Sequence, residues 1–284
     1  MDHELRSPRV SIIIPYYNHG KFIDETLASV DRIADKKIYE VVIVNDGSTD
    51  PYSQERIAEI AKSGQYKVIN QKNQGVCAAR NNAIAHSQGE FILPLDSDNR
   101  LLPEFVNEAI RVLDSDRGVT IVYCDYNLFG AQTGVRRAGP FNLQRLMLGN
   151  YIDNCSMFRR SLITEIGGYD PFPPLIGNED WELWLRAAFK GYKFHYIEKP
   201  LFDYRVAENS QITRLLADRK KGNANAQYLM EKYKDYYGPQ YIDEMILGKF
   251  RSGFAGNFFK LILKLYFPKK FERMVAAGKL RKYL

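Results

Sequence analysis

Four short apolar runs, each followed by a polar segment, divide the first hundred residues of the chain. Each run has the length of a buried β-strand, and apolar residues at helical spacing separate one run from the next. The runs cover residues 10–14, 39–44, 66–69 and 91–95. Strands that alternate with helices pair in parallel through right-handed crossovers. The pattern therefore predicts an α/β fold with a mostly parallel central sheet flanked by helices.

The polar segments after these runs cover residues 15–20, 45–50, 70–75 and 96–99. In parallel sheets of this kind, ligands bind beyond the carboxyl ends of the strands. We therefore expect the four segments to meet at one edge of the sheet. Within the second segment, Asp50 is expected to cap a helix that starts at Pro51.

After Leu101 the pattern becomes less regular. Helices are expected to about residue 113, at 143–148 and at 160–166, with strands at 120–123 and 155–158 and a hairpin or loop at 128–140. Asn178 is expected to cap a further helix, because Trp181, Trp184 and Leu185 follow it at helical spacing. Short strands are predicted at 194–197 and 201–205, and the chain from residue 211 is mostly helical in pattern.

Composition narrows the class of protein. A chain of 284 residues, 45% hydrophobic, suits one large α/β domain or two modest ones. No uncharged apolar run reaches the roughly 18 residues of a membrane span, and the charged amino terminus lacks an apolar signal segment. Cys77, Cys124 and Cys155 show no metal-ligand spacing and suit reduced thiols, so we expect a cytoplasmic protein.

Two acids follow the fourth apolar run, Asp96 and Asp98, with Ser97 between them. Hard cations such as Mg²⁺ prefer carboxylate oxygens, and metal-bound phosphates complete the shell. The alternative is a plain loop, since Asp, Ser and Asn are ordinary turn residues. The convergence of four polar segments at one sheet edge favours the metal site.

The other segments suit a nucleotide diphosphate. Tyr17 could stack on a base, and Asp46 could accept from a ring N–H. Gly75 allows the backbone to approach a phosphate at a helix amino terminus, and Arg80 lies in the second turn of that helix. Each has a simpler alternative: Tyr17 plugs the sheet edge, Asp46 only makes a turn, or Arg80 is solvated. No P-loop lysine motif or dinucleotide fingerprint occurs, so phosphate binding would depend on a metal.

Glu179 and Asp180 are adjacent at the start of a predicted helix, beside Trp181. Acids in the first turn are favoured by the helix dipole, which explains them without a catalytic role. Alternatively, the aromatic neighbour partly desolvates one carboxylate and raises its pKa towards that of a general base. The residues by themselves leave both interpretations open.

Taken in order, these motifs resemble the inverting family 2 glycosyltransferases with the GT-A fold, over about residues 8–212. The matching stretches are 10–18, 41–50, 73–75, 79–81, 95–99, 167–170, 179–186 and 200–205. The resemblance implies transfer of a single sugar from a nucleotide-diphospho-sugar, with a UDP-sugar favoured, to an acceptor hydroxyl. The acceptor would be a glycan or a lipid-linked intermediate of a surface polysaccharide.

The resemblance also implies roles for individual residues. The implied nucleotide-binding set is Pro15, Tyr17, Asn18, Asp46, Gly75, Arg80, Asp96 and Ser97. Asp96 and Asp98 match the family's Asp-x-Asp motif, whose last acid binds Mg²⁺ or Mn²⁺ and whose first acid lies near the ribose. Asp180 matches the general base, with Glu179 as its neighbour. One base and one direct displacement imply inversion.

The chain departs from the family pattern in two places. Many relatives carry a histidine that approaches the metal where this chain has Ala207, and Glu208 or Asn209 could substitute for it. Residues 211–215 match the start of the Gln-x-x-Arg-Trp motif of processive synthases but lack the Trp.

The extent of the resemblance also suggests the domain organisation. We expect a catalytic domain at 1–210, with a nucleotide-binding half at 1–99 and an acceptor-binding half at 100–210.

The remaining residues, 211–284, are expected to form a helical basic extension. From residue 245 to the end there are ten bases and one acid, a charge of +9, although the whole chain carries only +6. The apolar stretch 258–267 either packs on the catalytic domain or lies on an anionic membrane surface. The second alternative would place 249–284 on the inner face of the cytoplasmic membrane. No nucleic-acid motif is present, so no nucleic-acid partner is expected.

Two other classes of function compete with the transferase. A non-catalytic nucleotide-sugar-binding or scaffold protein could share the donor site, and the missing histidine at position 207 leaves that class open. A nucleotidyltransferase also pairs an α/β sheet with metal-binding acids. It would need a glycine-rich loop with a Lys or Arg after the first strand, which residues 15–18 do not supply.

Overall fold

The computed structural model describes residues 7–171, 177–207, 225, 228–237 and 267–276. The chain divides into two compact units, residues 1–225 and 226–284. The first unit contains the sheet. In the second, helix α12 (Pro268–Ala276) carries Lys269, Lys270 and Arg273 on its exposed surface. The expected domain boundary at residue 210, the motif at 211–215 and most of the stretch 258–267 lie outside the described residues.

The first four strands are parallel, which confirms the prediction for this half of the sheet. They are β1 (Val10–Tyr16), β2 (Tyr39–Asp46), β3 (Lys67–Gln71) and β4 (Phe91–Pro94). In the sheet they lie in the order β3-β2-β1-β4. Because the chain returns each time through a helix, the carboxyl ends of all four strands lie at the same edge.

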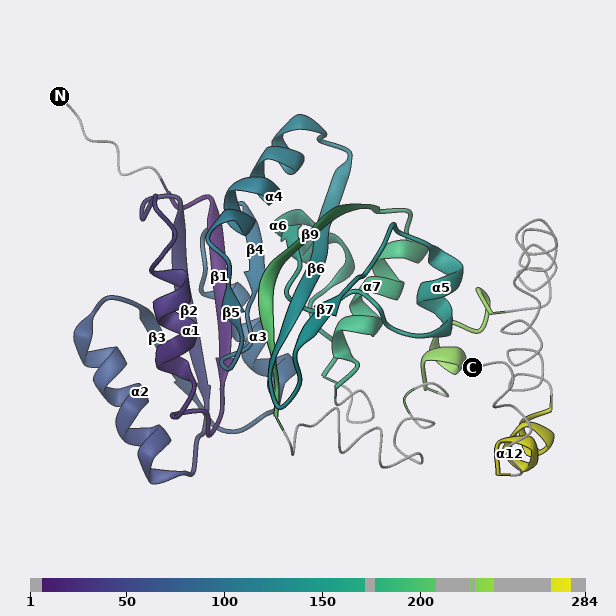
Figure 1. The fold of residues 1–284 in the computed structure, drawn as a ribbon, viewed down its shortest axis with the longest axis horizontal. Coiled ribbons are helices and arrows are strands. Elements are labelled where there is room, and N and C mark those ends of the chain that lie inside the picture. Colours follow the sequence, from purple (N-terminus) through teal and green to yellow (C-terminus); the bar gives the residue numbers. More distant parts are fainter. Residues whose placement is uncertain (1–6, 172–176, 208–224, 226–227, 238–266, 277–284) are drawn as a thin grey trace. The chain divides into compact units, whose positions relative to one another are not determined.

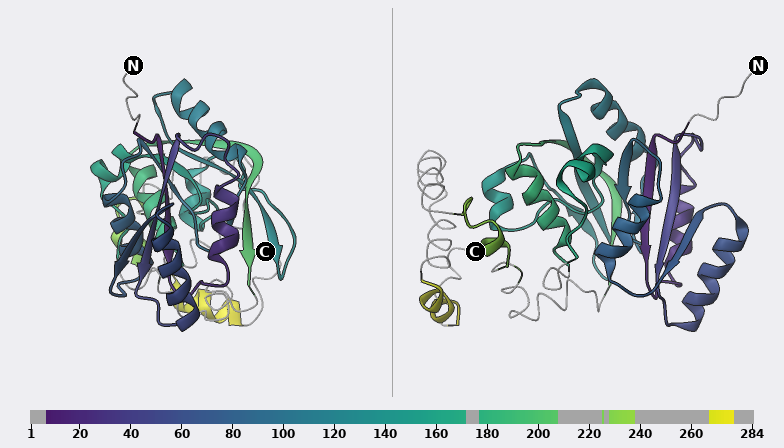
Figure 2. Two further views of the ribbon diagram at one scale, coloured as in Figure 1. Left: turned by 90° about the vertical axis from the view of Figure 1, so that its left-hand side faces the viewer. Right: turned by 180° about the vertical axis from the view of Figure 1, so that it is seen from behind.

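The connecting helices cover both faces of these strands. They are α1 (Ile23–Val30), α2 (Pro51–Ser63) and α3 (Val76–Ala85), and α4 (Glu104–Ser115) follows the fourth strand. Figures 1 and 2 show α1 on one face of the strands and α3 on the opposite face. The expected cap of α2 is confirmed, since the Asp50 side chain accepts from the Ser53 N–H at 2.9 Å.

The second half of the sheet is mixed, and its order continues as β8-β6-β9-β5, with β7 paired to β6. Its elements are β5 (Arg100–Leu101), β6 (Val119–Gly130), β7 (Gly134–Arg136), α5 (Leu143–Leu148), β8 (Met157–Arg159), α6 (Arg160–Ile166), α7 (Glu179–Phe189) and β9 (Lys193–Val206). Parallel β6 and β9 form the long curved pair in Figure 1. β6 and β7 form a hairpin whose turn and second strand lie within 128–140, where a hairpin or loop was expected, although its first strand starts earlier.

The prediction of two short strands at 194–197 and 201–205 was wrong, because the structure has a single strand there, β9. Its pairing with β6 shifts register between Cys124–Ile197 and Asp125–Pro200. Pro200 interrupts the alternating pattern in the sequence because it has no N–H to donate to a strand ladder. An irregularity in the pairing accommodates such a residue without ending the strand.

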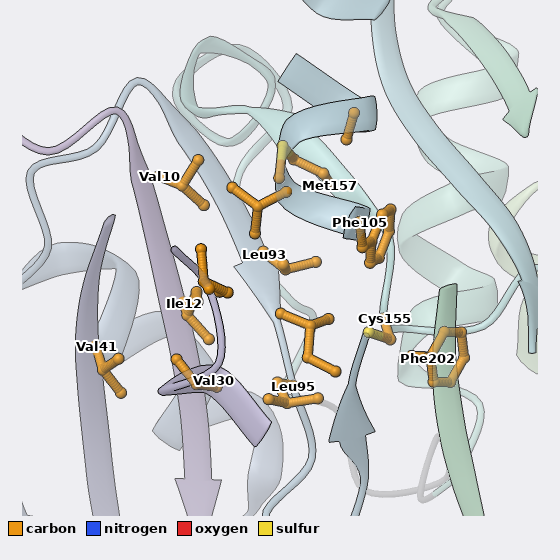
Figure 3. Packing of buried hydrophobic residues seen from close by; sticks show 14 of the residues in the cluster. Val10, Ile12, Val30, Val41, Leu93, Leu95, Phe105, Cys155, Met157 and Phe202 are labelled. Atoms are coloured by element: carbon orange, nitrogen blue, oxygen red, sulfur yellow. The ribbon is translucent and has the colours of Figure 1, made fainter. Parts of the chain in front are cut away.

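One hydrophobic core lies on the face of the sheet that α1 and α4 cover. Alternate residues of β1, such as Val10 and Ile12, point into it, as do Leu93 of the neighbouring strand β4 and Leu95 just after that strand (Figure 3). Phe202 of β9 belongs to the same cluster, so the core joins both halves of the sheet. Among the described residues, no helix has both the length and the apolarity needed to cross a membrane.

Candidate active site

The four polar segments meet at the carboxyl edge of the parallel strands, as the sequence predicted. Asn18 accepts from the backbone N–H groups of Thr49 (2.8 Å) and Asp50 (2.9 Å), which ties the first segment to the second. His19 Nδ1 lies 2.8 Å from Ser97 Oγ, which ties the first segment to the fourth. Hydrogen bonds therefore join separate loops at this edge of the sheet.

Asp46 does more than form a turn, because it holds the third segment in place. Its Oδ1 accepts from the Gln74 N–H and the Gln71 side chain, both at 2.8 Å, and its Oδ2 accepts from the Gly75 N–H at 2.8 Å. Gly75 has a φ of +87°, which favours glycine, and it precedes the first turn of α3. The predicted contact of Asp46 with a base stays a prediction.

Arg80 is buried, at 3% exposure, so the alternative of a solvated helix residue is wrong. Its Nη2 donates to Asp96 Oδ1 at 2.7 Å, and its Nη1 donates to Glu179 Oε1 at 2.8 Å. Burial by itself lowers the pKa of Arg80, but the charges of Asp96 and Glu179 outweigh it and raise that pKa. One guanidinium thus joins the acid pair after β4 to the acids at the start of α7.

Residues that the sequence did not single out hold this guanidinium. It lies over the ring of Tyr169, 5.3 Å from the centroid. The amide of Asn154 satisfies both neighbours when its oxygen accepts from Arg80 Nε at 3.3 Å and its nitrogen donates to the Tyr169 hydroxyl at 2.7 Å. Asn81 bonds the backbone N–H and C=O of Tyr169, each at 2.8 Å. The 79–81 and 167–170 motifs therefore form one packed unit.

Asp96 and Asp98 lie at the centre of the edge. Burial raises the pKa of Asp98, and the charge of Asp96 raises it further. The end of β9 lies beside them, because Arg205 Nε donates to the Asp98 carbonyl at 2.9 Å and the Arg205 N–H donates to Asn99 Oδ1 at 2.9 Å. Ala207, at the position where a histidine was expected, follows two residues after Arg205 in the chain.

The acid pair fits a hard divalent cation by its chemistry, since both side chains offer only oxygen and carry like charge. Among the described residues, no three His, Cys, Asp or Glu side chains gather closely enough to hold an ion by themselves. A cation at Asp96 and Asp98 would therefore need further oxygens from a bound diphosphate. Glu208 and Asn209, the expected substitutes for the histidine, lie outside the described residues.

Asp180 has both carboxylate oxygens held. Oδ2 accepts from Asn150 Nδ2 and Oδ1 accepts from the Trp181 N–H, each at 2.8 Å. Burial raises the pKa of Asp180, and the charges of Glu179 and Asp153 raise it further. Asn178 does occupy the cap position of α7, but its side chain makes no capping bond.

Asp153 is a further acid near the site that the sequence did not single out. It lies just before β8, and its Oδ1 accepts from the Cys155 N–H at 2.8 Å. Burial, followed by the charge of Asp96, raises its pKa to about 7. The only signal in the sequence was a polar Asp-Asn pair before an apolar run, which is also an ordinary turn pattern.

Tyr17 and Pro15 differ in their surroundings. Pro15 is buried in β1, where it pairs in register with Val44 of β2. The Tyr17 side chain is 43% exposed just beyond the end of that strand. Its ring therefore does not plug the sheet edge, and it is accessible to a ligand at the carboxyl ends of the strands.

Sequence comparison relates the chain to glycosyltransferases. The family described as "Glycosyl transferase family 2" matches residues 11–167, and "Glycosyl transferase family group 2" matches 91–274. The Bacillus subtilis protein named "Putative glycosyltransferase EpsH" is 30% identical over 228 residues. That match covers 74% of this chain and 64% of EpsH. An uncharacterized glycosyltransferase of Methanocaldococcus jannaschii, MJ1057, is 25% identical over 214 residues, 72% of each chain.

Structural comparison gives the same fold. The crystal structure of S. aureus TarS 1–349 in complex with UDP-GlcNAc superposes with a TM-score of 0.61 at 20% sequence identity. The match covers 89% of this chain and 81% of that structure. The architecture is thus that of the GT-A glycosyltransferases, and the family match spans more than half of the sequence. This chain therefore belongs to glycosyltransferase family 2.

Proposed function

We propose that the chain is an inverting glycosyltransferase that moves one sugar from a nucleotide-diphospho-sugar to an acceptor hydroxyl. The observation that carries the proposal is the bridge made by Arg80, which joins Asp96 on the donor side to Glu179 beside Asp180. One buried guanidinium contacts both an acid of the proposed nucleotide site and the neighbour of the proposed base, which supports a reaction between these two groups. A displacement reaction requires that arrangement of donor and base.

The donor binds at the carboxyl ends of β1 to β4. Tyr17 stacks on the base, Asp46 accepts from a ring N–H, and Pro15, Asn18, Gly75 and Ser97 shape the site for the nucleoside and its ribose. Asp96 lies near the ribose. Mg²⁺ or Mn²⁺ bound at Asp96 and Asp98 would offset the charge that develops on the leaving diphosphate.

Asp180 acts as the general base. Asn150 and the Trp181 N–H fix its orientation, and its raised pKa strengthens it as a proton acceptor. The acceptor hydroxyl gives its proton to Asp180 as its oxygen forms a bond to the anomeric carbon. The bond from that carbon to the diphosphate oxygen breaks on the opposite face, so the configuration inverts.

The donor preference and the acceptor are extensions of this proposal. The TarS structure with UDP-GlcNAc shows this fold with a bound UDP-sugar, which supports a UDP-sugar as the first donor to test. The acceptor is a glycan or lipid-linked intermediate of the cell envelope, bound by residues 100–210. We also propose that the basic extension associates with an anionic membrane surface. A truncated protein that ends at Gly248 would then no longer sediment with anionic liposomes.

A donor screen tests the proposal directly. Hydrolysis and binding of UDP-, GDP- and dTDP-sugars would be measured with Mg²⁺ and Mn²⁺ on the full chain. We expect one nucleotide class to bind and turn over slowly without an acceptor. Binding without any turnover would favour a non-catalytic nucleotide-sugar-binding protein, and the absence of both with every donor would refute the proposal.

The base is tested by Asp180→Asn. We expect turnover to fall by about 10²–10⁴-fold while donor affinity stays within about twofold, because the residue acts on the proton and not on the nucleotide. The matched control is Asp24→Asn, which removes the same charge from the exposed start of α1, where Asp24 pairs with Arg56. Unchanged turnover in Asp180→Asn would rule out this residue as the base.

A further inference from the structure

The segment 150–155 is fixed at two points by opposite sides of the site. At one end Asn150 donates to Asp180, the candidate base, at 2.8 Å. At the other end Asn154, with its amide oxygen turned towards Arg80, accepts from the guanidinium that also holds Asp96. Asp153 lies between these two contacts. The segment that carries Asp153 therefore contacts both sides of the site.

A direct displacement places the leaving oxygen, the reacting carbon and the incoming oxygen nearly in line. If the diphosphate leaves from the side of Asp98 and the acceptor oxygen enters from the side of Asp180, the transferred sugar ring lies between them. That space is the one that Asp153 adjoins. The electrostatic influence of Asp153 on Asp180 agrees with this placement.

The Asp153 carboxylate has one oxygen to offer. Oδ1 is held by the Cys155 N–H, and within the described part of the chain Oδ2 has no hydrogen-bond partner. The side chain is partly exposed, so a ligand can reach this oxygen. A carboxylate oxygen accepts from hydroxyl groups, which are the groups that a sugar ring presents.

Glu179 provides a second, independent observation. Its side chain is only 9% exposed, and Oε1 bonds Arg80. Its Oε2 is buried and has no hydrogen-bond partner among the residues that the structure describes. A buried acceptor without a donor is costly, so a native structure normally supplies one from water or a ligand. A sugar hydroxyl would satisfy it.

The charge of the site restricts the kind of sugar. Five acids that influence one another electrostatically belong to the candidate site: Asp96, Asp98, Asp153, Glu179 and Asp180. Among the described residues, Arg80 is the only base that bonds any of these carboxylates. A divalent cation and the charge of a diphosphate would offset each other. Acids therefore outnumber bases around the sugar in the described part of the chain, even with His19 and Arg205 acting on Asp98.

We infer that the transferred sugar is neutral, that its hydroxyls are bound by Asp153 and Glu179, and that sugars carrying a carboxylate are excluded. The inference rests on the proposed function and names its substrate class. A uronic acid would bring a further negative charge next to Asp153, where the one described base that bonds these acids, Arg80, is already held by Asp96 and Glu179. Juxtaposed like charges are a recognised means of rejecting the wrong ligand.

The test compares three ligands that share one nucleotide: UDP, UDP-glucose and UDP-glucuronic acid, each with Mn²⁺. Affinities are measured by calorimetry on the full chain. If the donor screen selects another nucleotide, the same set is made with it. We expect the neutral donor to bind at least as tightly as the nucleotide and the uronic donor at least about tenfold more weakly than the neutral one.

The variants Asp153→Asn and Glu179→Gln identify the residues responsible. Each should narrow the difference in affinity between the neutral and uronic donors by about threefold and slow hydrolysis of the neutral donor, with affinity for UDP itself unchanged. Asp24→Asn, with the same charge change far from the site, should leave the difference in affinity between the neutral and uronic donors unchanged. Thermal unfolding of each variant confirms that it is folded.

Failure of the inference is distinguishable from failure of the proposed function. If UDP and its sugars do not bind with any metal, and no other nucleotide does, the proposed function fails. If UDP binds but the uronic donor binds as tightly as the neutral one, the neutral-sugar inference is wrong and the transferase stands. If the gap exists but neither variant narrows it, the assignment to Asp153 and Glu179 is wrong.

Discussion

Replacement of Arg80 by Met tests whether the buried bridge stabilises the site. Met keeps an unbranched apolar stem but removes the guanidinium. Glu179, whose side chain is 9% exposed, would then be a buried carboxylate without a partner. Breaking a buried ion pair by removing one member costs about 3–5 kcal/mol. Asp96, whose side chain is 33% exposed, can turn to water and should add no more than about 1 kcal/mol.

We therefore expect Arg80→Met to lower the free energy of unfolding by about 3–5 kcal/mol, a large share of the roughly 5–15 kcal/mol of a typical domain. The assay is urea unfolding followed by tryptophan fluorescence. It suits this protein because its 2 tryptophans, Trp181 and Trp184, both lie on α7 beside the bridge. Their emission reports the region where the change is made.

The double variant Arg80→Met/Glu179→Gln separates the buried charge from lost packing. If the unpaired carboxylate is the cause, removing its charge should recover about 1–3 kcal/mol. The matched control is Arg56→Met, since Arg56 also pairs with two acids, but its side chain is 32% exposed and those of its partners 51% and 56%. That variant should lose less than about 1 kcal/mol.

Two results would refute this reasoning. If Arg80→Met and Arg56→Met lose similar amounts of stability, burial does not make the bridge special. If the double variant is no more stable than Arg80→Met, the unpaired charge of Glu179 is not the cause of the loss. In either case the bridge would be a contact without the energetic role that its burial implies.

Three further predictions follow from other contacts. The pKa of Asp153 is raised to about 7 in the folded chain. Between about pH 4 and 7 the folded chain therefore binds more protons than the unfolded chain, and the contribution of Asp153 to stability falls as the pH rises. Asp153→Asn should therefore be more stable than the parent by about 1–3 kcal/mol at pH 8 and equal to it at pH 4. If urea unfolding gives the same difference in stability between variant and parent at both pH values, this reasoning is contradicted. Gly168→Ala should cost about 1–3 kcal/mol, because the new Cβ would lie 2.2 Å from Asn81 Oδ1, whereas Gly149→Ala meets nothing within 4 Å and should be nearly neutral in thermal unfolding. Asp46→Ala leaves three donors of the third segment unpaired and should weaken nucleotide binding by about tenfold in calorimetry, and unchanged affinity would show that this segment does not form the donor site.

The parallel half of the sheet was predictable because local pattern and topology agree there. Each apolar run ends in a polar segment, and parallel connections bring the carboxyl ends of such strands to one edge. That rule by itself predicts that Asp46, Gly75 and Asp96 lie at the same edge. The second half was harder to predict, since β9 contains Pro200 and reads as two strands. Only its pairing with β6 makes it continuous.

The sequence by itself determined which residues of this protein carry charge and hydrogen-bonding groups, and in what order. It pointed to the acids at 96, 98, 179 and 180 because adjacent or alternating carboxylates after a buried run form a pattern that can be seen locally. It left open whether Arg80 was solvated, and it gave no reason to select Asp153. Neither question can be answered from neighbours in the chain.

Only the tertiary structure showed that Arg80 is buried and that Asp153 lies near the candidate site, because the surroundings of both residues come from distant segments. Arg80 is buried since Asp96 and Glu179, 16 and 99 residues away, converge on it. Asp153 belongs to the site because its segment is held by Asp180 and Arg80. The free energy of a charge depends on what surrounds it in space, and those surroundings are set by the packing of the sheet and its helices.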